Sequence, residues 1–385
     1  MASSHLLPSL HIPTLILLLI MSKTGGCCFT HIFCFGDSIS DTGNLLSSLG
    51  DRYHPIRNLP YGETYFHRAT GRFCDGRLIL DFIAQAYKLP FIPAYLSGNN
   101  TYDFPHGMNF AVGGATAMNN SFFESKGIDQ SHWTDYSLDI QLQWFKKLLP
   151  TIMENPGCCS DIMNNALFVV GEIGGNDYNY PLLHGRTIDE VRTFIPDVIS
   201  AVSLTIKELI GYGAKTLLVP NNFPIGCLPS YLTHFQSKKK EDYEPETGCI
   251  KRLNEFSQLH NSMLLEELEK LRLFYPDVAI IYADYYEASM SIFRNPQELG
   301  FNYTLITCCG SKGPYNYSSL ASCGNQGSTV CSDPSKYASW DGNHMTEAAY
   351  KVISQGVLQG TYSYPPLSNI CPNPFNKSSS LSSTI

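Results

Sequence analysis

The stretch HIFCFGDSISDTGN, residues 31–44, sets an apolar run directly against a polar turn. The run His31–Phe35 is continuous rather than alternating, which is typical of a strand buried on both faces of a parallel sheet. It stops at Gly36, and Asp37, Ser38 and Asp41 follow. Asp and Ser are common in loops and at helix N-termini, so Ser38 is either a nucleophile held at a strand end or part of an ordinary cap.

Further short apolar runs alternate with segments of helical period. The runs cover residues 107–112, 166–170, 214–219 and 278–283, and the helical segments cover 77–88, 189–212, 247–275 and 346–357. Pro196 lies inside the second helical segment, where it either kinks the helix or marks its true start. Strands that alternate with helices predict an α/β fold, a three-layer α/β/α sandwich around a parallel sheet of about five strands.

Residues 27–363 are therefore predicted to form a single domain, and the Pro- and Ser-rich residues 364–385 a poorly ordered tail. The chain has 385 residues, of which 43% are hydrophobic and 16% charged, enough to bury a large core. The formal net charge is −8, and the only basic run, residues 238–240, is followed at once by two acidic residues. Nucleic-acid binding therefore has little support.

The N-terminus resembles a secretory leader. An apolar segment over residues 10–21 is followed by the small residues Gly25 and Gly26. This segment is too short for a typical membrane span, so we predict a signal peptide at residues 1–26 and a secreted protein. An uncleaved anchor is the alternative. No later stretch is apolar for long enough to cross a bilayer, so stable membrane insertion is not expected.

The sequons and cysteines are also consistent with a secreted protein. N-x-[ST] sequons occur at five positions, Asn99, Asn119, Asn302, Asn316 and Asn376. None of the 13 cysteines forms a C-x-x-C pair, which argues against zinc ribbons and thioredoxin-like sites. Structural disulfides are expected among the loop cysteines, namely Cys158, Cys159, Cys227 with Cys249, Cys308, Cys309, Cys323 and Cys331. Cys34, inside the apolar run, is expected to be buried.

Four polar islands lie at or near the ends of predicted strands or before the last helix: residues 36–38, 109–115, 171–177 and 340–344. In a parallel sheet, chemistry collects at the carboxyl ends of the strands. A serine nucleophile needs a base, a carboxylate that orients the base, and donors for the oxyanion. Asp341 and His344 have the spacing of an orienting carboxylate and a base, and Asn176 offers an amide donor.

Each island also has an ordinary explanation. Gly113–Gly114 can be a tight turn, Asn176 can belong to an Asn/Asp cap, and a D-x-x-H spacing arises by chance. Asp37 and Asp41 are interpreted as caps that hold the loop around Ser38. The presence of all four islands in one chain, in an order that a parallel sheet can bring together, favours a catalytic site.

Several motifs resemble those of the GDSL esterase/lipase family, the SGNH hydrolases, in its secreted plant branch. They are F-G-D-S-I-S-D-T-G-N, N-F-A-V-G-G-A-T-A, G-E-I-G-G-N-D and W-D-G-N-H-M-T-E-A-A-Y, flanked by P-Y-G-E-T-Y-F, G-R-F-C-D-G-R, F-P-I-G-C and C-C-G-x-x-G-P-Y-N-Y. The resemblance extends from about residue 31 to residue 357, with Ile39 where the family name has leucine. It implies a flavodoxin-like α/β/α fold. No G-x-S-x-G nucleophile elbow occurs in the chain.

The resemblance also implies roles for individual residues. Ser38 would be the nucleophile and, through its N–H, the first oxyanion donor, with Gly114 and Asn176 as the second and third donors. Gly113 is the neighbouring alternative to Gly114. His344 would be the base and Asp341 its support. No cofactor and no metal is implied.

The expected activity is hydrolysis of a carboxylic ester of a small plant metabolite through an acyl-enzyme on Ser38. The blocks P-Y-G-E-T-Y-F, D-Y-Y and C-C-G-x-x-G-P-Y-N-Y resemble the small-ester side of the plant branch, which includes acetylajmalan esterase-like enzymes. The expected partner is a small-molecule ester, bound by a monomer.

Other functions remain open at this point. An acyltransferase would use the same Ser-His-Asp site, and a lipase would act on longer acyl chains. A metal-dependent phosphoesterase would use Asp37, Asp177, Asp341 and His344 as ligands, although no recognised ligand spacing is present. A non-catalytic binding protein would have no need to retain all four site residues.

Overall fold

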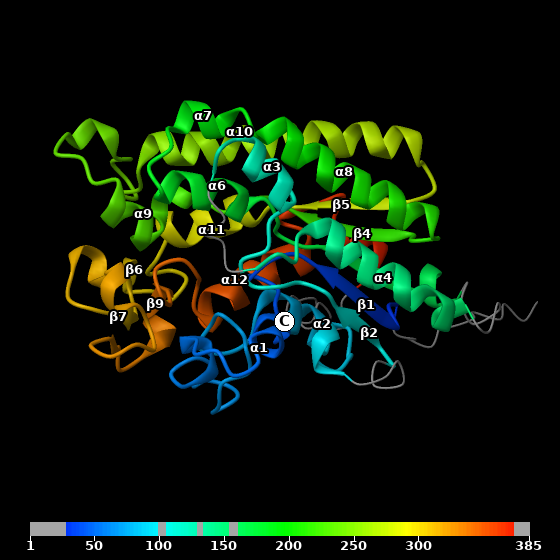
Figure 1. The fold of residues 1–385 in the computed structure, drawn as a ribbon, viewed down its shortest axis with the longest axis horizontal. Helices are drawn as coiled ribbons and strands as arrows, with labels where there is room; N and C mark the ends of the chain where they lie inside the picture. The colour runs from blue at the N-terminus through cyan, green and yellow to red at the C-terminus, as the bar shows by residue number, and fades with distance from the viewer. Residues whose placement is uncertain (1–27, 99–104, 129–133, 154–160, 373–385) are drawn as a thin grey trace, which may run out of the picture.

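A six-stranded sheet forms the centre of the protein (Figure 1). The computed structural model describes residues 28–98, 105–128, 134–153 and 161–372, so the predicted signal peptide at 1–26 lies outside the described residues. The strand order is β10-β5-β4-β3-β1-β2, and all neighbours are parallel except β10 and β5. The strands are β1 (His31–Phe35), β2 (Gly107–Asn109), β3 (Ala166–Val170), β4 (Thr216–Pro220), β5 (Ala279–Ala283) and β10 (Ser363–Tyr364).

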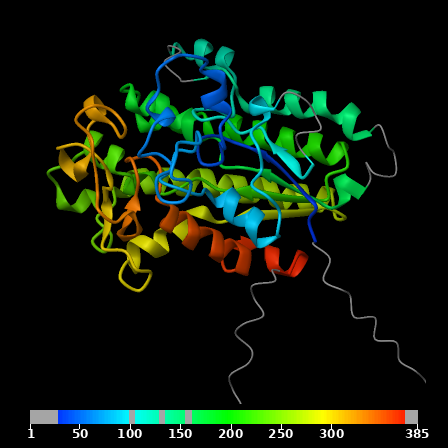
Figure 2. The same cartoon turned by 90° about the horizontal axis from the view of Figure 1, so that it is seen from below.

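Helices cover both faces of the sheet. Along β1 the side chains alternate, with Phe33 and Phe35 in one apolar cluster and Ile32 and Cys34 in the other. The first cluster is covered by α4 (Leu138–Met153), α8 (Ile195–Gly211) and α10 (Lys251–Phe274), and the second by α2 (Ile79–Ala86), α11 (Tyr285–Arg294) and α12 (Glu347–Gln359). Figure 2 shows the two layers on either side of the sheet. The predicted three-layer α/β/α fold is confirmed.

Smaller elements gather near the carboxyl ends of the strands. Two short two-stranded sheets, drawn in orange at the left of Figure 1, pair β6 with β9 and β7 with β8. These elements are β6 (Tyr303–Thr307), β7 (Cys309–Gly310), β8 (Thr329–Val330) and β9 (Tyr337–Ser339). Further α-helices among the described residues are α1 (Asn44–Ser48), α3 (Asn120–Ser125), α6 (Gly175–Leu183), α7 (Ile188–Arg192), α9 (Pro229–His234) and α13 (Leu367–Ile370).

Two expectations about element boundaries change. The helical segment at 189–212 is two helices, α7 and α8, and Pro196 lies in the first turn of α8, so it marks the start of that helix. The tail predicted from residue 364 is wrong for residues 364–372. There β10 pairs with β5, α13 follows, and Cys371 is bonded to Cys28. A two-residue strand has no pattern of its own, so only its pairing with Tyr282 and Ala283 reveals it. Residues 373–385 lie outside the described part.

The disulfides cross-link the loops and join the two ends of the domain. Cys227–Cys249 forms as expected, and the other predicted loop cysteines pair as Cys308–Cys331 and Cys309–Cys323. Cys28–Cys371 joins residues 343 apart in the sequence. Cys34 is buried and unbonded, as is Cys74. Cys158 and Cys159 lie outside the described residues. Among the described residues, no helix is long and apolar enough to span a membrane.

Candidate active site

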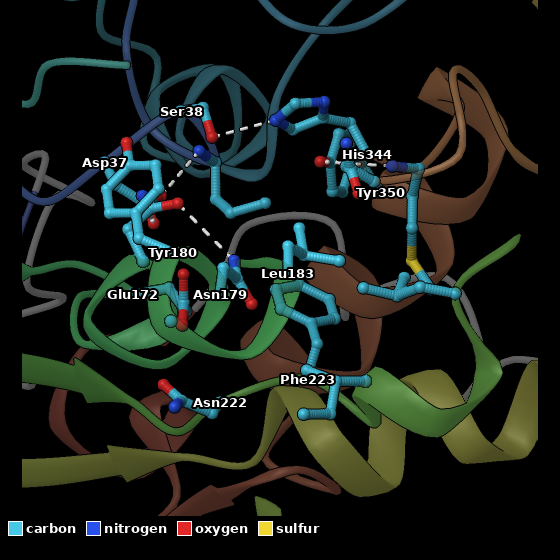
Figure 3. Close-up of a pocket in the computed structure, with 17 residues that line it drawn as sticks. Asp37, Ser38, Glu172, Asn179, Tyr180, Leu183, Asn222, Phe223, His344 and Tyr350 are labelled. Carbon is cyan, nitrogen blue, oxygen red and sulfur yellow. Dashed lines mark hydrogen bonds between the residues drawn. The ribbon is translucent and has the colours of Figure 1, made fainter. Parts of the chain in front are cut away.

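Ser38 lies in a tight turn directly after β1. Gly36, with φ of +140°, ends the strand where a side chain would press against the Glu172 carbonyl oxygen, 3.0 Å from an ideal Cβ. The Asp37 carbonyl accepts the N–H groups of Ser40 and Asp41 at 3.1 and 3.0 Å, which closes one helical turn around Ser38. This turn directs the Ser38 hydroxyl into a cavity at the carboxyl edge of the sheet (Figure 3).

His344 and Asp341 approach Ser38 from the loop before α12. Ser38 Oγ lies 2.8 Å from His344 Nε2, and His344 Nδ1 lies 2.8 Å from Asp341 Oδ2. All three residues are buried. Asp341 Oδ1 also accepts the backbone N–H groups of Asn343 and His344 at 3.0 and 2.9 Å. The three side chains form a hydrogen-bonded row from carboxylate to hydroxyl.

Burial alone would raise the pKa of Asp341, but the charge and hydrogen bonds of His344 outweigh it, so this pKa lies below its ordinary value. Asp341 therefore stays ionised beside the imidazole. An ionised carboxylate at Nδ1 holds the tautomer that leaves Nε2 free to accept the serine proton.

Tyr61 and Phe73 complete the surroundings of this row. The Tyr61 hydroxyl donates to Asp341 Oδ2 at 3.0 Å, and the Phe73 ring lies 4.8 Å from the His344 ring. No sequence pattern predicts a role for either residue. The only signal was that they fall in the P-Y-G-E-T-Y-F and G-R-F-C-D-G-R blocks, which the chain shares with the family it resembles.

Two of the predicted oxyanion donors are the backbone N–H groups of Ser38 and Gly114. Within the described residues, neither the Ser38 N–H nor the Gly114 N–H donates a hydrogen bond, so both are available to a substrate oxygen. The Gly113 N–H is instead held by Asp41 Oδ2 at 2.7 Å, which favours Gly114 over its neighbour. Gly114 has φ of +81°, and its carbonyl accepts the Tyr180 hydroxyl at 2.7 Å.

Asn176, at the start of α6, presents its amide to this turn. Its Nδ2 donates to Asp37 Oδ2 and to the Ala115 carbonyl, both at 3.0 Å. Asn179 Nδ2 lies 3.4 Å from Asn176 Oδ1, and the Tyr231 hydroxyl bonds Asn179 Oδ1. This chain of contacts fixes the orientation of the amide, with Nδ2 toward Asp37 and Ala115 and Oδ1 toward Asn179.

Asp41 ties two polar islands together. Its carboxylate accepts the N–H groups of Gly43, Asn44 and Leu45 at 2.7, 2.6 and 3.0 Å, in addition to Gly113. The interpretation of Asp41 as a cap is confirmed, and the Gly113 contact extends it. Through this one side chain, the Ser38 loop and the Gly113–Gly114 loop keep a fixed separation.

A carboxyl pair lies beneath Ser38, formed by Asp37 and Glu172. Both residues are buried, and their side chains are hydrogen-bonded to each other. Burial raises the pKa of Asp37 to about 6, and burial together with the nearby Asp37 charge raises the pKa of Glu172 well above its ordinary value. Glu172 therefore holds a proton that it donates to Asp37. A glutamate at the end of an apolar strand was the signal for it in the sequence.

The metal-ligand set considered from the sequence does not assemble. Asp177 accepts the N–H groups of Ala117 and Met118 at 2.8 and 2.9 Å, and both ring nitrogens of His344 are engaged by Ser38 and Asp341. Over the described ranges, no group of three or more His, Cys, Asp and Glu side chains could hold a metal ion.

Two cavities meet at His344. The first, of about 110 Å³, contains Ser38 and Asn176 and has an apolar wall of Leu183, Phe223, Ile225, Leu228 and Met345 (Figure 3). The second, of about 420 Å³, lies against Asp341, Asn343 and His344.

Comparison with known proteins shows the family to which the chain belongs. The profile of the GDSL-like Lipase/Acylhydrolase family matches residues 32–357. The chain belongs to this family. Three Arabidopsis thaliana proteins named GDSL esterase/lipase At1g28600, At1g31550 and At1g28580 are 49%, 48% and 46% identical to it. The alignments cover 93%, 95% and 98% of this chain and 91%, 92% and 97% of the respective relatives. This GDSL protein is accordingly a carboxylic ester hydrolase.

Proposed function

We propose that this GDSL protein is a secreted serine esterase that hydrolyses an ester of a small plant metabolite through an acyl-enzyme on Ser38. One observation carries the proposal: the buried row in which Ser38 Oγ, His344 and Asp341 follow one another at 2.8 Å steps. Such a row activates a hydroxyl that is otherwise a weak nucleophile.

In the first step, His344 Nε2 takes the Ser38 proton as Oγ bonds to the ester carbonyl carbon. The negative charge moves to the carbonyl oxygen, where the N–H groups of Ser38 and Gly114 and the Asn176 amide donate to it. The C–O bond to the alcohol then breaks, and His344 gives its proton to the leaving oxygen. In the second step, water attacks the acyl-enzyme with His344 as base, releasing the carboxylic acid and restoring Ser38.

The size of the cavity beside Ser38 supports a small acyl group. An apolar cavity of about 150 Å³ holds one benzene ring. The roughly 110 Å³ available here therefore suits an acyl chain of a few carbons rather than a hydroxycinnamoyl group or a long fatty acid. This favours the small-ester branch, with its acetylajmalan esterase-like enzymes, over a lipase. An acyltransferase would use the same residues, with an acceptor alcohol in place of water.

Secretion is part of the proposal. The expected leader at 1–26 and the four disulfides support it, because disulfides persist in oxidising compartments. Asn119 and Asn302 are exposed sequons and would accept a glycan. The Asn316 amide donates to the Thr307 carbonyl at 3.0 Å, which makes it a poorer acceptor. Asn99 and Asn376 lie outside the described residues. We expect a monomer.

The decisive experiment is Ser38→Ala in the secreted, disulfide-bonded protein. We expect no turnover of p-nitrophenyl acetate, an unchanged unfolding midpoint, and loss of covalent labelling by a fluorophosphonate probe. A Ser40→Ala variant, in the same loop but without contact to His344, is the control for loop damage. Retained hydrolysis by Ser38→Ala would refute the assignment. Analysis of products with and without added alcohols separates hydrolysis from acyl transfer.

A further inference from the structure

The second cavity adjoins the proposed catalytic row but does not contain Ser38. Asn343 and His344 line both cavities, so the two cavities adjoin at the His344 loop. At about 420 Å³, the second cavity is nearly four times the volume of the first. Nothing in the reaction steps described above uses this space.

Aromatic rings form the wall of the second cavity. Tyr317 packs over Gly342, where an ideal Cβ would lie 2.4 Å from the ring. Tyr61 and Phe73 meet edge to face at 6.2 Å between ring centres, and Phe73 continues the wall to His344. An apolar aromatic surface therefore leads directly to the imidazole that must protonate the leaving group.

Two loops hold this wall in place. The disulfide Cys309–Cys323 anchors the loop that carries the lining residues Ser319 and Ser322. Across the cavity, the Tyr53 hydroxyl donates to Asn325 Oδ1 at 3.1 Å. Tyr53 and Leu320, beside lining residues of the two loops, are 68% and 95% exposed, so two large side chains with apolar surface lie next to the cavity.

The charged groups that line the second cavity restrict the charge of the ligand it can bind. Asp341 is the only carboxylate among the described lining residues, and it is engaged by His344 and Tyr61. No lysine or arginine lines the cavity over the same ranges, and burial lowers the pKa of His54, which favours its neutral form. A cationic or anionic ligand would find no free counter-charge there, whereas a neutral ring would pack against the aromatic wall.

We propose that the second cavity binds the alcohol half of the ester and that this half is a neutral, ring-bearing alcohol. The leaving oxygen must lie at His344 Nε2, so the alcohol extends past the imidazole, while the acyl chain stays in the small cavity beside Ser38. A volume of about 420 Å³ is nearly three times the roughly 150 Å³ that holds one benzene ring, so two fused rings fit. This inference rests on the proposed esterase function of Ser38.

The test uses acetates of four alcohols on the intact, disulfide-bonded protein: ethanol, 2-phenylethanol, 2-(1-naphthyl)ethanol and choline. These are all primary alcohols, so differences in kcat/KM mainly report binding of the alcohol half. We expect kcat/KM to rise from ethyl to naphthylethyl acetate and to be low for acetylcholine. A preference for acetylcholine, or equal values for the three neutral acetates, would overturn the inference.

Variants locate the effect in the second cavity. Tyr317→Ala should lower kcat/KM for naphthylethyl acetate about tenfold relative to ethyl acetate. Tyr317→Phe keeps the ring and should retain most of the wild-type kcat/KM for naphthylethyl acetate. Ser319→Trp adds bulk at an exposed lining position, so it should fold and block the larger alcohols selectively. Phe274→Ala, exposed at the end of α10, is the control. Parallel losses on all acetates would contradict the assignment.

A binding measurement separates this inference from the esterase assignment. Calorimetry of 2-(1-naphthyl)ethanol with Ser38→Ala requires no turnover. Binding that Ser319→Trp weakens supports the cavity even if Ser38 proves not to be the nucleophile. Ser38-dependent hydrolysis combined with binding that Ser319→Trp leaves unchanged would refute the inference alone.

Discussion

Replacement of Asn176 by alanine is the most informative test of the oxyanion site. Asn176 Nδ2 donates one hydrogen to Asp37 Oδ2 and the other to the Ala115 carbonyl, both at 3.0 Å, so donation to a substrate oxygen would replace one of these two bonds. Loss of one oxyanion donor typically lowers kcat by about 10²–10³, or about 2.7–4 kcal/mol. We expect a loss in this range with KM little changed, since the donor acts on charge that develops in the transition state.

The same change has a cost in stability. It removes two hydrogen bonds and leaves Asp37 Oδ2 without its amide partner, which we expect to lower the free energy of unfolding by about 1–3 kcal/mol. A domain of this size should remain folded, so a melting curve distinguishes a folded, slow enzyme from an unfolded one. Asn176→Asp keeps the shape, cannot donate when ionised and lies beside Asp37, so it should be at least as slow.

The assay is steady-state hydrolysis of p-nitrophenyl acetate with active sites counted by fluorophosphonate labelling. Asn222→Ala is the matched control, because Asn222 lines the same cavity but lies away from Ser38 (Figure 3). Its kcat should fall much less. If both Asn176 variants keep kcat within about fivefold of the wild type while Ser38→Ala is inactive, Asn176 is not an oxyanion donor.

Three further predictions concern the surroundings of the site. Tyr61→Phe removes the hydroxyl bound to Asp341 Oδ2 and should lower kcat/KM about tenfold, since a hydrogen bond to a charged group is worth about 1.5–3 kcal/mol; an unchanged kcat/KM would contradict its role. Burial raises the pKa of Asp37 to about 6 and that of Glu172 well above its ordinary value, so the folded protein holds these protons more tightly than the unfolded chain. The free energy of unfolding should therefore fall as pH rises from about 4 through 6, and the contribution of Glu172 should continue to fall above pH 6. Glu172→Gln should flatten this fall in urea titrations, and identical slopes would count against a shared proton. Cys371→Ser should lower the free energy of unfolding by about 2–5 kcal/mol with little effect on hydrolysis at 25 °C, and an unchanged urea midpoint would show the disulfide to be dispensable.

Local sequence was sufficient to predict the elements that have a distinctive hydrophobic pattern. The strands at 31–35 and 166–170 have the predicted bounds, because doubly buried strands read as continuous apolar runs. Asp341 and His344 lie close in sequence, so their contact follows from a single turn. From the sequence, Pro196 predicted either a kink in a helix or the start of one, and in the structure it lies in the first turn of α8.

The site beyond these local features depends on distant contacts. Spacing could not choose between Gly113 and Gly114, and it is Asp41, 72 residues away, that occupies the Gly113 N–H. Tyr61 reaches Asp341 across 280 residues, and Glu172 meets Asp37 because β1 and β3 are neighbours in the sheet. No periodicity encodes such pairs.

By itself, then, the sequence determined an α/β/α hydrolase-type chain and the residues from which its chemistry would come. Folding decided the rest: the closing strand β10, the orientation of the Asn176 amide, the carboxyl pair under Ser38, and the two cavities that meet at His344. The physical reason is the distance along the sequence over which each kind of interaction acts. Strand and turn preferences act over a few residues, whereas cavities and buried hydrogen bonds exist only once remote segments pack together.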